Sequence, residues 1–196
     1  MKLVDLQYWI FDMDGTLTHS VHDFEAIRAE LGITPNAPIL EVLAELPEAQ
    51  AQPLYERLDQ IELELARNAV AQPGVKLALE RLHERGKHLG IVTRNSRLCA
   101  AETLSCCELE QFFAPECIIT RESATPKPAP DGVNKLLTRW QADPKDGVMV
   151  GDYLFDLQAG RSAGTWTLYI DPKGQFEFRE HADACLAGLN ELLEHL

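Results

Sequence analysis

The sequence lacks long apolar runs and positive net charge, and each absence excludes a class of partner. A membrane-spanning helix needs about 20 consecutive, mainly apolar residues, and no segment approaches that length. Lysine and arginine together number 18 against 31 aspartate and glutamate residues, so the formal net charge is -13 at pH 7. An acidic surface repels nucleic-acid phosphates and anionic lipids. We therefore expect no nucleic acid and no membrane among the partners.

Cysteine is sparse, and its spacing excludes two common uses. The five cysteines are odd in number, include the adjacent Cys106 and Cys107, and show neither a CxxC zinc spacing nor the density of a disulfide framework. Near the N-terminus, Asp5 interrupts a short apolar stretch that has no small-residue cleavage site, unlike a secretory signal. These features predict reduced thiols and a cytoplasmic protein. We expect its assembly to be a monomer or a homodimer.

What the sequence does contain is an alternation of strand and helix patterns. Its 196 residues, 45% of them hydrophobic, suffice for one domain with an insert or for two small domains. Apolar runs bounded by Gly, Pro or Asp predict buried strands at 8–11, 88–92, 117–120, 147–150 and 165–170. Helical patterns lie at 75–84, 96–105, 131–140, 153–163 and 189–196. This alternation predicts an α/β fold with right-handed crossovers and a mainly parallel sheet.

Residues 18–72 break the alternation with helical signals alone. Apolar residues recur there at helical spacing in two stretches, the first of which ends at Gly32. They are Phe24, Ile27, Leu31, Leu54, Leu58, Ile61 and Leu65. The letters IELEL also alternate as a strand would, but the helical spacing continues on both sides of them. We expect an inserted helical subdomain over 18–72, with the main domain formed by 1–17 and 73–196.

The first predicted strand ends on two carboxylates, Asp12 and Asp14, in the stretch WIFDMDGTLTHS. Residues two apart in an extended chain point the same way, and Gly15 then allows a sharp turn. The carboxyl edge of a parallel sheet is where loops and helix N-termini gather around ligands. The two side chains are therefore candidates for one site, although such a pair also occurs as a plain polar exit from a strand.

Three further stretches carry polar residues near the ends of other predicted strands. Thr93 in GIVTRN offers a hydroxyl, Lys127 in TPKPAP a cation, and VMVGDYLFD the carboxylates of Asp152 and Asp156. Each stretch alone has a simpler interpretation: helix capping for Thr93, a solvated lysine in a proline loop, and an N-cap with a favourable charge in the first helical turn. The simple interpretations weaken when the stretches are taken together, because they would meet at one edge of the sheet.

Taken together, these residues predict a magnesium and phosphate site. Clustered carboxylates repel one another unless a cation neutralises them, and hard oxygen ligands suit Mg²⁺. Lysine and a hydroxyl then complete the requirements for phosphate. Aspartate is ionised at neutral pH, so it acts as a nucleophile without a partner base.

With these four motifs in order, the chain resembles the haloacid dehalogenase-like hydrolase superfamily, in its phosphoglycolate-phosphatase-like branch. DMDGT at 12–16 resembles the first motif, Thr93 in IVTRN the second, Lys127 in TPKPAP the third and GDYLFD at 151–156 the fourth. The resemblance covers essentially the whole chain. It implies an α/β, Rossmann-like, mainly parallel sheet with helices on both faces, plus a small inserted α-helical cap over 18–72.

The resemblance also implies roles for the motif residues in a Mg²⁺-dependent phosphatase. Asp12 would be the nucleophile and Asp14 the general acid and base. The metal ligands would be Asp12, the backbone carbonyl of Asp14, Asp152 and, in support, Asp156. Thr93, Lys127 and Asn95 would bind the phosphoryl group of a small phosphorylated metabolite.

Two rival functions share parts of this pattern. A phosphosugar mutase of the β-phosphoglucomutase type has the same motifs and returns the phosphoryl group to its substrate. A phospho-accepting receiver domain also clusters aspartates with a threonine and a lysine around Mg²⁺. DxDGT on the first strand and a long insert oppose the receiver interpretation.

Several residues outside the motifs carry weaker predictions. Candidate substrate contacts in the insert are His19, His22, Arg28, Tyr55 and Arg67. The two histidines are more simply exposed hinge residues, since no third metal ligand lies near them in sequence. We expect the three tryptophans, Trp9, Trp140 and Trp166, to be packing residues. We expect the acidic Glu56, Asp59, Glu62 and Glu64 to form a solvated helix face.

Overall fold

The computed structural model describes residues 2–195, and a parallel sheet lies at its centre. Within those residues the sheet has six strands in the order β3-β2-β1-β4-β5-β6. The strands are β1 (Tyr8–Phe11), β2 (His88–Val92), β3 (Ile118–Ile119), β4 (Gly147–Gly151), β5 (Trp166–Ile170) and β6 (Ala184–Leu186). The order reverses between β1 and β4, where open α/β sheets bind their ligands. This Rossmann-like fold confirms the predicted fold class.

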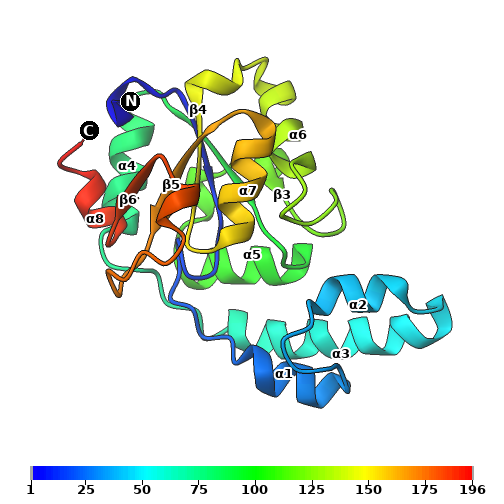
Figure 1. Ribbon diagram of the computed structural model, residues 1–196. Helices are drawn as coiled ribbons and strands as arrows, with labels where there is room; N and C mark the ends of the chain where they lie inside the picture. Colours follow the sequence, from blue (N-terminus) through cyan, green and yellow to red (C-terminus); the bar gives the residue numbers. More distant parts are fainter. Residues whose placement is uncertain (1, 196) are drawn as a thin grey trace.

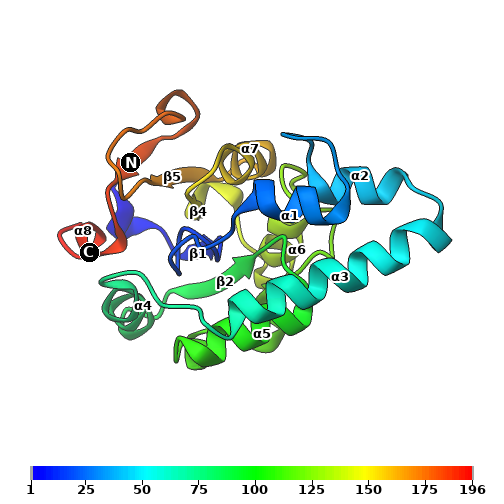
Figure 2. The same ribbon diagram turned by 90° about the horizontal axis from the view of Figure 1, so that it is seen from below.

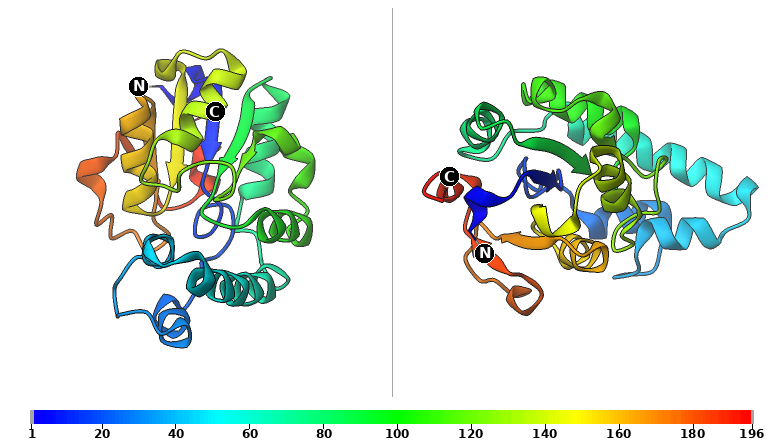
Figure 3. Two further views of the ribbon diagram at one scale, coloured as in Figure 1. Left: turned by 90° about the vertical axis from the view of Figure 1, so that its right-hand side faces the viewer. Right: turned by 90° about the horizontal axis from the view of Figure 1, so that it is seen from above.

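Helices cover both faces of the sheet because its strands are apolar on both sides (Figure 3). Trp9 and Phe11 of β1 pack with α4 (Val75–Glu84), α5 (Arg97–Cys106) and α8 (Leu189–Leu192). Ile10, which points the opposite way, packs with α6 (Asp131–Trp140) and α7 (Leu154–Ala163). The alternation along a single strand therefore separates the two apolar layers.

Three helices lie apart from the sheet and form what we call the helical lobe, residues 24–66 (Figures 1 and 2). They are α1 (Phe24–Leu31), α2 (Ile39–Glu45) and α3 (Glu48–Ala66). The lobe buries its own apolar cluster, which includes Ile27, Leu43 and Leu58. The IELEL letters lie within α3, as the helical spacing predicts. None of the helices in residues 2–195 is long and apolar enough to cross a bilayer.

Two neighbouring segments connect the lobe to the sheet. Thr18 forms bridges with Asp14 and Ala71, and the His19 backbone N–H donates to the Val70 carbonyl at 3.0 Å. The backbone N–H of Gln72 donates in return to the Leu17 carbonyl at 2.9 Å. The chain therefore leaves and re-enters the sheet domain at one place, next to Asp14.

The structure differs from the sequence prediction at several elements. The third strand is shorter than 117–120 because Cys117 ends a 3-10 turn. The last helix ends at Leu192, and residue 196 of the predicted range lies outside the described residues. The short edge strand β6 was not predicted. Trp166 is 37% exposed and its indole N–H donates to the Lys145 carbonyl, so the prediction that it packs in the core is wrong.

Candidate active site

The predicted site residues come together in one cavity at the carboxyl edge of the sheet. Asp12 directly follows β1, Thr93 follows β2 and Asp152 follows β4. Lys127 comes from the segment between β3 and α6, and Asp156 from the first turn of α7. The cavity has a volume of about 480 Å³, and the lobe forms its other wall. All seven predicted residues line it: Asp12, Asp14, Thr93, Asn95, Lys127, Asp152 and Asp156.

Lys127 is a buried cation between two carboxylates. Its Nζ donates to Asp12 Oδ1 and lies 2.7 Å from Asp156 Oδ1. The lysine side chain is only 2% exposed. Burial opposes its charge, but the attraction of Asp12 and Asp156 outweighs burial and raises the pKa of Lys127. Lys127 therefore stays charged, and the simpler interpretation as a solvated lysine in a proline loop does not hold.

Three carboxylates converge beside this lysine. Oxygen atoms of Asp12, Asp152 and Asp156 all lie within 4.8 Å of one another. Burial, reinforced by the charge of Asp12, raises the pKa of Asp152 to about 9. Burial also raises the pKa of Asp156 to about 6 and raises that of Asp12. One lysine does not balance three buried carboxylates, and a divalent cation with a preference for oxygen ligands fits this donor set.

The carboxylate of Asp14 is held away from that group. The side-chain amide of Asn95 donates to Asp14 Oδ2 at 2.6 Å, and the Thr18 hydroxyl lies 3.5 Å from Oδ1. Asp14 is not one of the three converging carboxylates, and its predicted roles as a ligand through the backbone carbonyl and as a proton carrier stay predictions. The phosphate contact predicted for Asn95 stays a prediction, since its amide contacts Asp14 in the structure.

Thr93 keeps its hydroxyl proton available. Its Oγ1 accepts a hydrogen bond from the backbone N–H of Asn95 at 3.1 Å, and the side chain is buried in the cavity wall. The helix that follows, α5, is capped by Ser96, whose Oγ accepts from the backbone N–H of Cys99 at 3.3 Å. Ser96 therefore caps α5, and the simpler interpretation of Thr93 as the helix cap does not hold.

Gly15 lets Asp152 approach the first strand. Its φ is +92°, and a Cβ atom built there would lie 2.1 Å from Asp152 Oδ2. A side chain at this position would push Asp152 away from Asp12 and Asp156. The glycine of DMDGT therefore has two functions, the turn and the room for a carboxylate.

We expect Gly15→Ala to destabilise the protein more than Gly32→Ala. Both glycines have positive φ, but nothing lies within 4 Å of a Cβ at Gly32. The left-handed conformation alone should cost about 1–2 kcal/mol in each variant, and displacement of Asp152 should add to it at Gly15. Thermal unfolding measures the stabilities, and calorimetric titration measures Mg²⁺ binding. Mg²⁺ affinity should fall only for Gly15→Ala. Equal stability and equal Mg²⁺ affinity of the two variants would contradict the close approach of Asp152 to Gly15.

Arg94 joins the sheet domain to the lobe. Its guanidinium makes two hydrogen bonds of 2.9 and 2.8 Å to the Glu41 carboxylate of α2, and its Cζ lies 5.3 Å from the centre of the Phe155 ring. It also donates to the Lys127 carbonyl. No local sequence pattern marks Arg94, because its partners Glu41 and Lys127 lie far from it along the chain.

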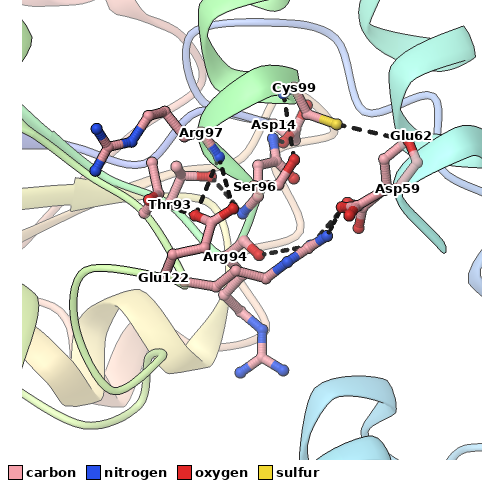
Figure 4. Close-up of polar contacts among 12 residues, drawn as sticks. Asp14, Asp59, Glu62, Thr93, Arg94, Ser96, Arg97, Cys99 and Glu122 are labelled. Carbon is pink, nitrogen blue, oxygen red and sulfur yellow. Dashed lines mark hydrogen bonds and ion pairs between the residues drawn. The ribbon is translucent and has the colours of Figure 1, made fainter. Parts of the chain in front are cut away.

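Further ion pairs join the sheet domain to α3 of the lobe at Asp59 and Glu62, which Figure 4 labels. Arg121 donates to Asp59 and to Glu62 of α3, the latter at 2.7 Å. The side chains of Arg121 and Glu62 are only 8% and 12% exposed. The solvated face predicted for α3 is therefore wrong for Glu62, which is nearly buried against Arg121, whereas the Asp59 side chain is 45% exposed although it pairs with Arg121. The prediction is right for Glu56 and Glu64, which are exposed.

Burial raises the pKa of Glu62 from 4.5 to about 7, against the attraction of Arg121 and with the repulsion of Asp59 and Asp14. The folded protein thus binds a proton more tightly than the unfolded chain does. The resulting stability is complete below about pH 4.5 and is lost as the pH rises through about 7. Burial of Glu62 therefore becomes less favourable as the pH rises, although its ionised form is the one that Arg121 attracts.

We expect Glu62→Gln to remove this pH dependence. Between pH 5 and pH 8 the variant should gain about 2 kcal/mol of stability relative to the wild type, because glutamine has no proton to lose. Urea unfolding at several pH values, with saturating Mg²⁺ to neutralise the aspartates, gives this difference. Glu64→Gln, an exposed change on the same helix, is the control. If the difference in free energy of unfolding between the wild type and Glu62→Gln were the same at every pH, Glu62 would not be the source of the pH dependence.

The residues of the 18–72 insert predicted to touch substrate divide into two groups. His22 and Arg28 line the cavity, whereas His19, Tyr55 and Arg67 are absent from the described residues that line it. His22 is half-buried and stacks on Phe24 with 5.3 Å between ring centres, so its prediction as an exposed hinge residue is wrong. Its Nδ1 is buried without a hydrogen-bond partner. His19 is exposed, as expected.

Comparison with known proteins matches both the fold and the motifs. A family described as haloacid dehalogenase-like hydrolase matches residues 9–170. An uncharacterized hydrolase of Saccharomyces cerevisiae is 30% identical over 94% of this chain and 88% of that protein. A phosphoglycolate phosphatase of Nitrosospira multiformis is 34% identical over 67% of this chain and 56% of that protein. The crystal structure of CbbY from Rhodobacter sphaeroides in complex with phosphate has the same fold, with a TM-score of 0.72, 22% identity and coverage of 97% and 99% of the two chains.

Proposed function

This chain belongs to the haloacid dehalogenase-like hydrolases, and on that premise we propose that it is a Mg²⁺-dependent phosphatase that hydrolyses a small phosphorylated metabolite through an aspartyl-phosphate on Asp12. The observation that carries the proposal is the group of three carboxylates beside Lys127, with Asp14 held apart by Asn95. This arrangement supplies a metal site, a nucleophile and a separate proton carrier within one cavity.

Mg²⁺, held by Asp12, Asp152, Asp156 and the backbone carbonyl of Asp14, would neutralise the charge that develops on the transferring phosphoryl oxygens. Lys127 would hold a phosphoryl oxygen from the other side with its remaining donors. The hydroxyl of Thr93 would donate a hydrogen bond to another. These donors are fixed before the substrate arrives, which is what electrostatic stabilisation requires.

Asp12 and Asp14 would divide the chemistry between them. A carboxylate oxygen of Asp12 forms a bond to phosphorus as the bond to the leaving oxygen breaks, and Asp14 gives its proton to that oxygen. Asp14 then takes a proton from water, whose oxygen attacks the phosphorus and releases Asp12 and inorganic phosphate. The contact with Asn95 fixes the direction of the Asp14 carboxylate for both transfers.

We also propose that residues 18–72 act as a cap subdomain over this site. The shared wall of the cavity and the paired connections at Thr18 and Ala71 support a lobe that opens and closes about one place. The ion pairs of Arg94 and Arg121 would then form on closure. The expected cytoplasmic location and the monomeric or homodimeric state stay predictions.

Phosphate release tests the proposed function. With Mg²⁺, the protein should release inorganic phosphate from p-nitrophenyl phosphate slowly and from some members of a panel of phosphorylated metabolites faster. Excess chelator should abolish both activities, and added Mg²⁺ should restore them. Full activity in chelator would contradict the metal requirement. Isomerised phosphosugars without free phosphate would show that the protein is a mutase.

A further inference from the structure

We propose that the substrate is a phosphate monoester of an uncharged alcohol with a largely apolar body, and that a second anionic group on the substrate is rejected. The proposal rests on the phosphatase function proposed above and concerns the same cavity. It follows from what faces the part of the cavity beyond Asp12 and Lys127.

The wall that would face the leaving group is mainly apolar and aromatic, although the polar residues Ser20, Asn36 and Tyr153 also line the cavity. The lobe contributes Phe24, Ile27, Ile39 and Leu58, and α7 contributes Phe155. Pockets of about 300–1,000 Å³ with mainly apolar walls hold ligands of drug size. At about 480 Å³, this cavity has room for a substantial body in addition to the phosphoryl group.

The arginine and lysine side chains that line the cavity are already paired. They are Arg28, Arg94 and Lys127. Arg28 donates from Nη1 to Glu25 and from Nε to the Ala37 carbonyl, both at 2.8 Å. Arg94 makes its two hydrogen bonds to Glu41. Neither arginine is left as a free cation for a carboxylate or a second phosphate.

The other acidic side chains that line the cavity add negative charge near the leaving group, in the case of Glu62 above about pH 7. Asp14 and Glu62 both line this cavity, in addition to the three carboxylates that would hold the metal. A carboxylate on the leaving group would lose its hydration without gaining a free cation, and like charges would lie near it. The unpartnered Nδ1 of His22 fits one hydrogen bond with an uncharged hydroxyl or carbonyl group. Phosphoglycolate, which carries a carboxylate on a two-carbon body, is by this reasoning a poor substrate.

Two substrates of nearly the same shape separate the effect of a negative charge on the leaving group from the effect of its size. 4-Carbamoylphenyl phosphate and 4-carboxyphenyl phosphate differ in one amide against one carboxylate. We expect kcat/KM to favour the neutral ester by about tenfold or more, because a desolvated, unpaired charge is strongly disfavoured. Both esters are assayed with saturating Mg²⁺ at the same pH and ionic strength.

The second part of the experiment uses Glu41→Gln, because this change removes the carboxylate partner of Arg94. In this variant the ratio of kcat/KM for the neutral ester to kcat/KM for the carboxylate ester should fall severalfold, because kcat/KM for 4-carboxyphenyl phosphate rises. Glu45→Gln, an exposed change on the same helix, should leave this ratio unchanged. The change in preference between variants cancels the intrinsic reactivity of the two esters.

The outcomes separate this inference from the proposed function. Hydrolysis of both esters without a preference for the neutral one would overturn the inference alone. So would an unchanged preference in Glu41→Gln, since Arg94 would then have no bearing on substrate charge. Hydrolysis of neither ester, nor of p-nitrophenyl phosphate, would contradict the phosphatase function and the inference with it.

Discussion

Asp12→Asn should fold normally and lose turnover by a factor on the order of 10⁴ or more, because an amide cannot form the acyl-phosphate. The substitution conserves the size of the side chain. Lys127 keeps Asp156 as its partner at 2.7 Å, so its charge is not left alone. One member of a repelling group of carboxylates is neutralised, which should make the variant at least as stable as the wild type without Mg²⁺.

Phosphate release and thermal unfolding together measure this prediction. Asp5→Asn, an exposed change in the same sheet domain, controls for the loss of one negative charge. An inactive variant that is also unfolded would show that the Asp12 carboxylate is required for folding, which would contradict this prediction. Near-normal turnover of a folded variant would show that another residue is the nucleophile.

Lys127→Ala should be the most destabilising single change at the site. It removes the buried cation from beside Asp12 and Asp156 and leaves their charges unpaired. Loss of one partner from a buried ion pair costs about 3–5 kcal/mol, and activity should fall with it because the phosphoryl group loses a donor. Because Mg²⁺ also neutralises these carboxylates, its addition should restore part of the stability.

Two further variants separate charge from volume. Lys127→Met keeps a long side chain without the charge and should lose nearly as much stability as Lys127→Ala. Lys135→Ala removes an exposed lysine and should change the stability by less than about 0.5 kcal/mol. Thermal unfolding in chelator and in Mg²⁺ gives both comparisons. If Lys127→Met were as stable as the wild type, the volume of the Lys127 side chain, and not its charge, would account for its contribution to stability.

The site was predictable from the sequence where it depends on strand ends. Asp12, Thr93 and Asp152 each follow an apolar run, and the carboxyl ends of parallel strands meet at one edge whatever the details of packing. Lys127 was predicted from its motif, but its burial between two carboxylates was not, since burial depends on how the segment after β3 folds back over the site.

The contacts between the lobe and the sheet domain were not predictable in the same way. Glu62 lies on a helix whose acidic residues all look solvated in sequence, and only the position of Arg121 distinguishes it from Glu64. Strand β6 has three residues, Ala184–Leu186, at the edge of the sheet, and so short an apolar stretch is a weak strand signal. Local patterns contain no information about such distant partners.

Trapping the phosphoenzyme tests directly whether Asp12 is the nucleophile. Asp14→Asn removes the general base that would clear Asp12, whereas p-nitrophenyl phosphate needs no acid to expel its leaving group. On mixing this variant with the aryl ester and Mg²⁺, we expect a burst of nitrophenol and, after acid quench, mass spectrometry that places a phosphoryl group on Asp12. Absence of a burst together with an unmodified Asp12 peptide would contradict the aspartyl-phosphate mechanism.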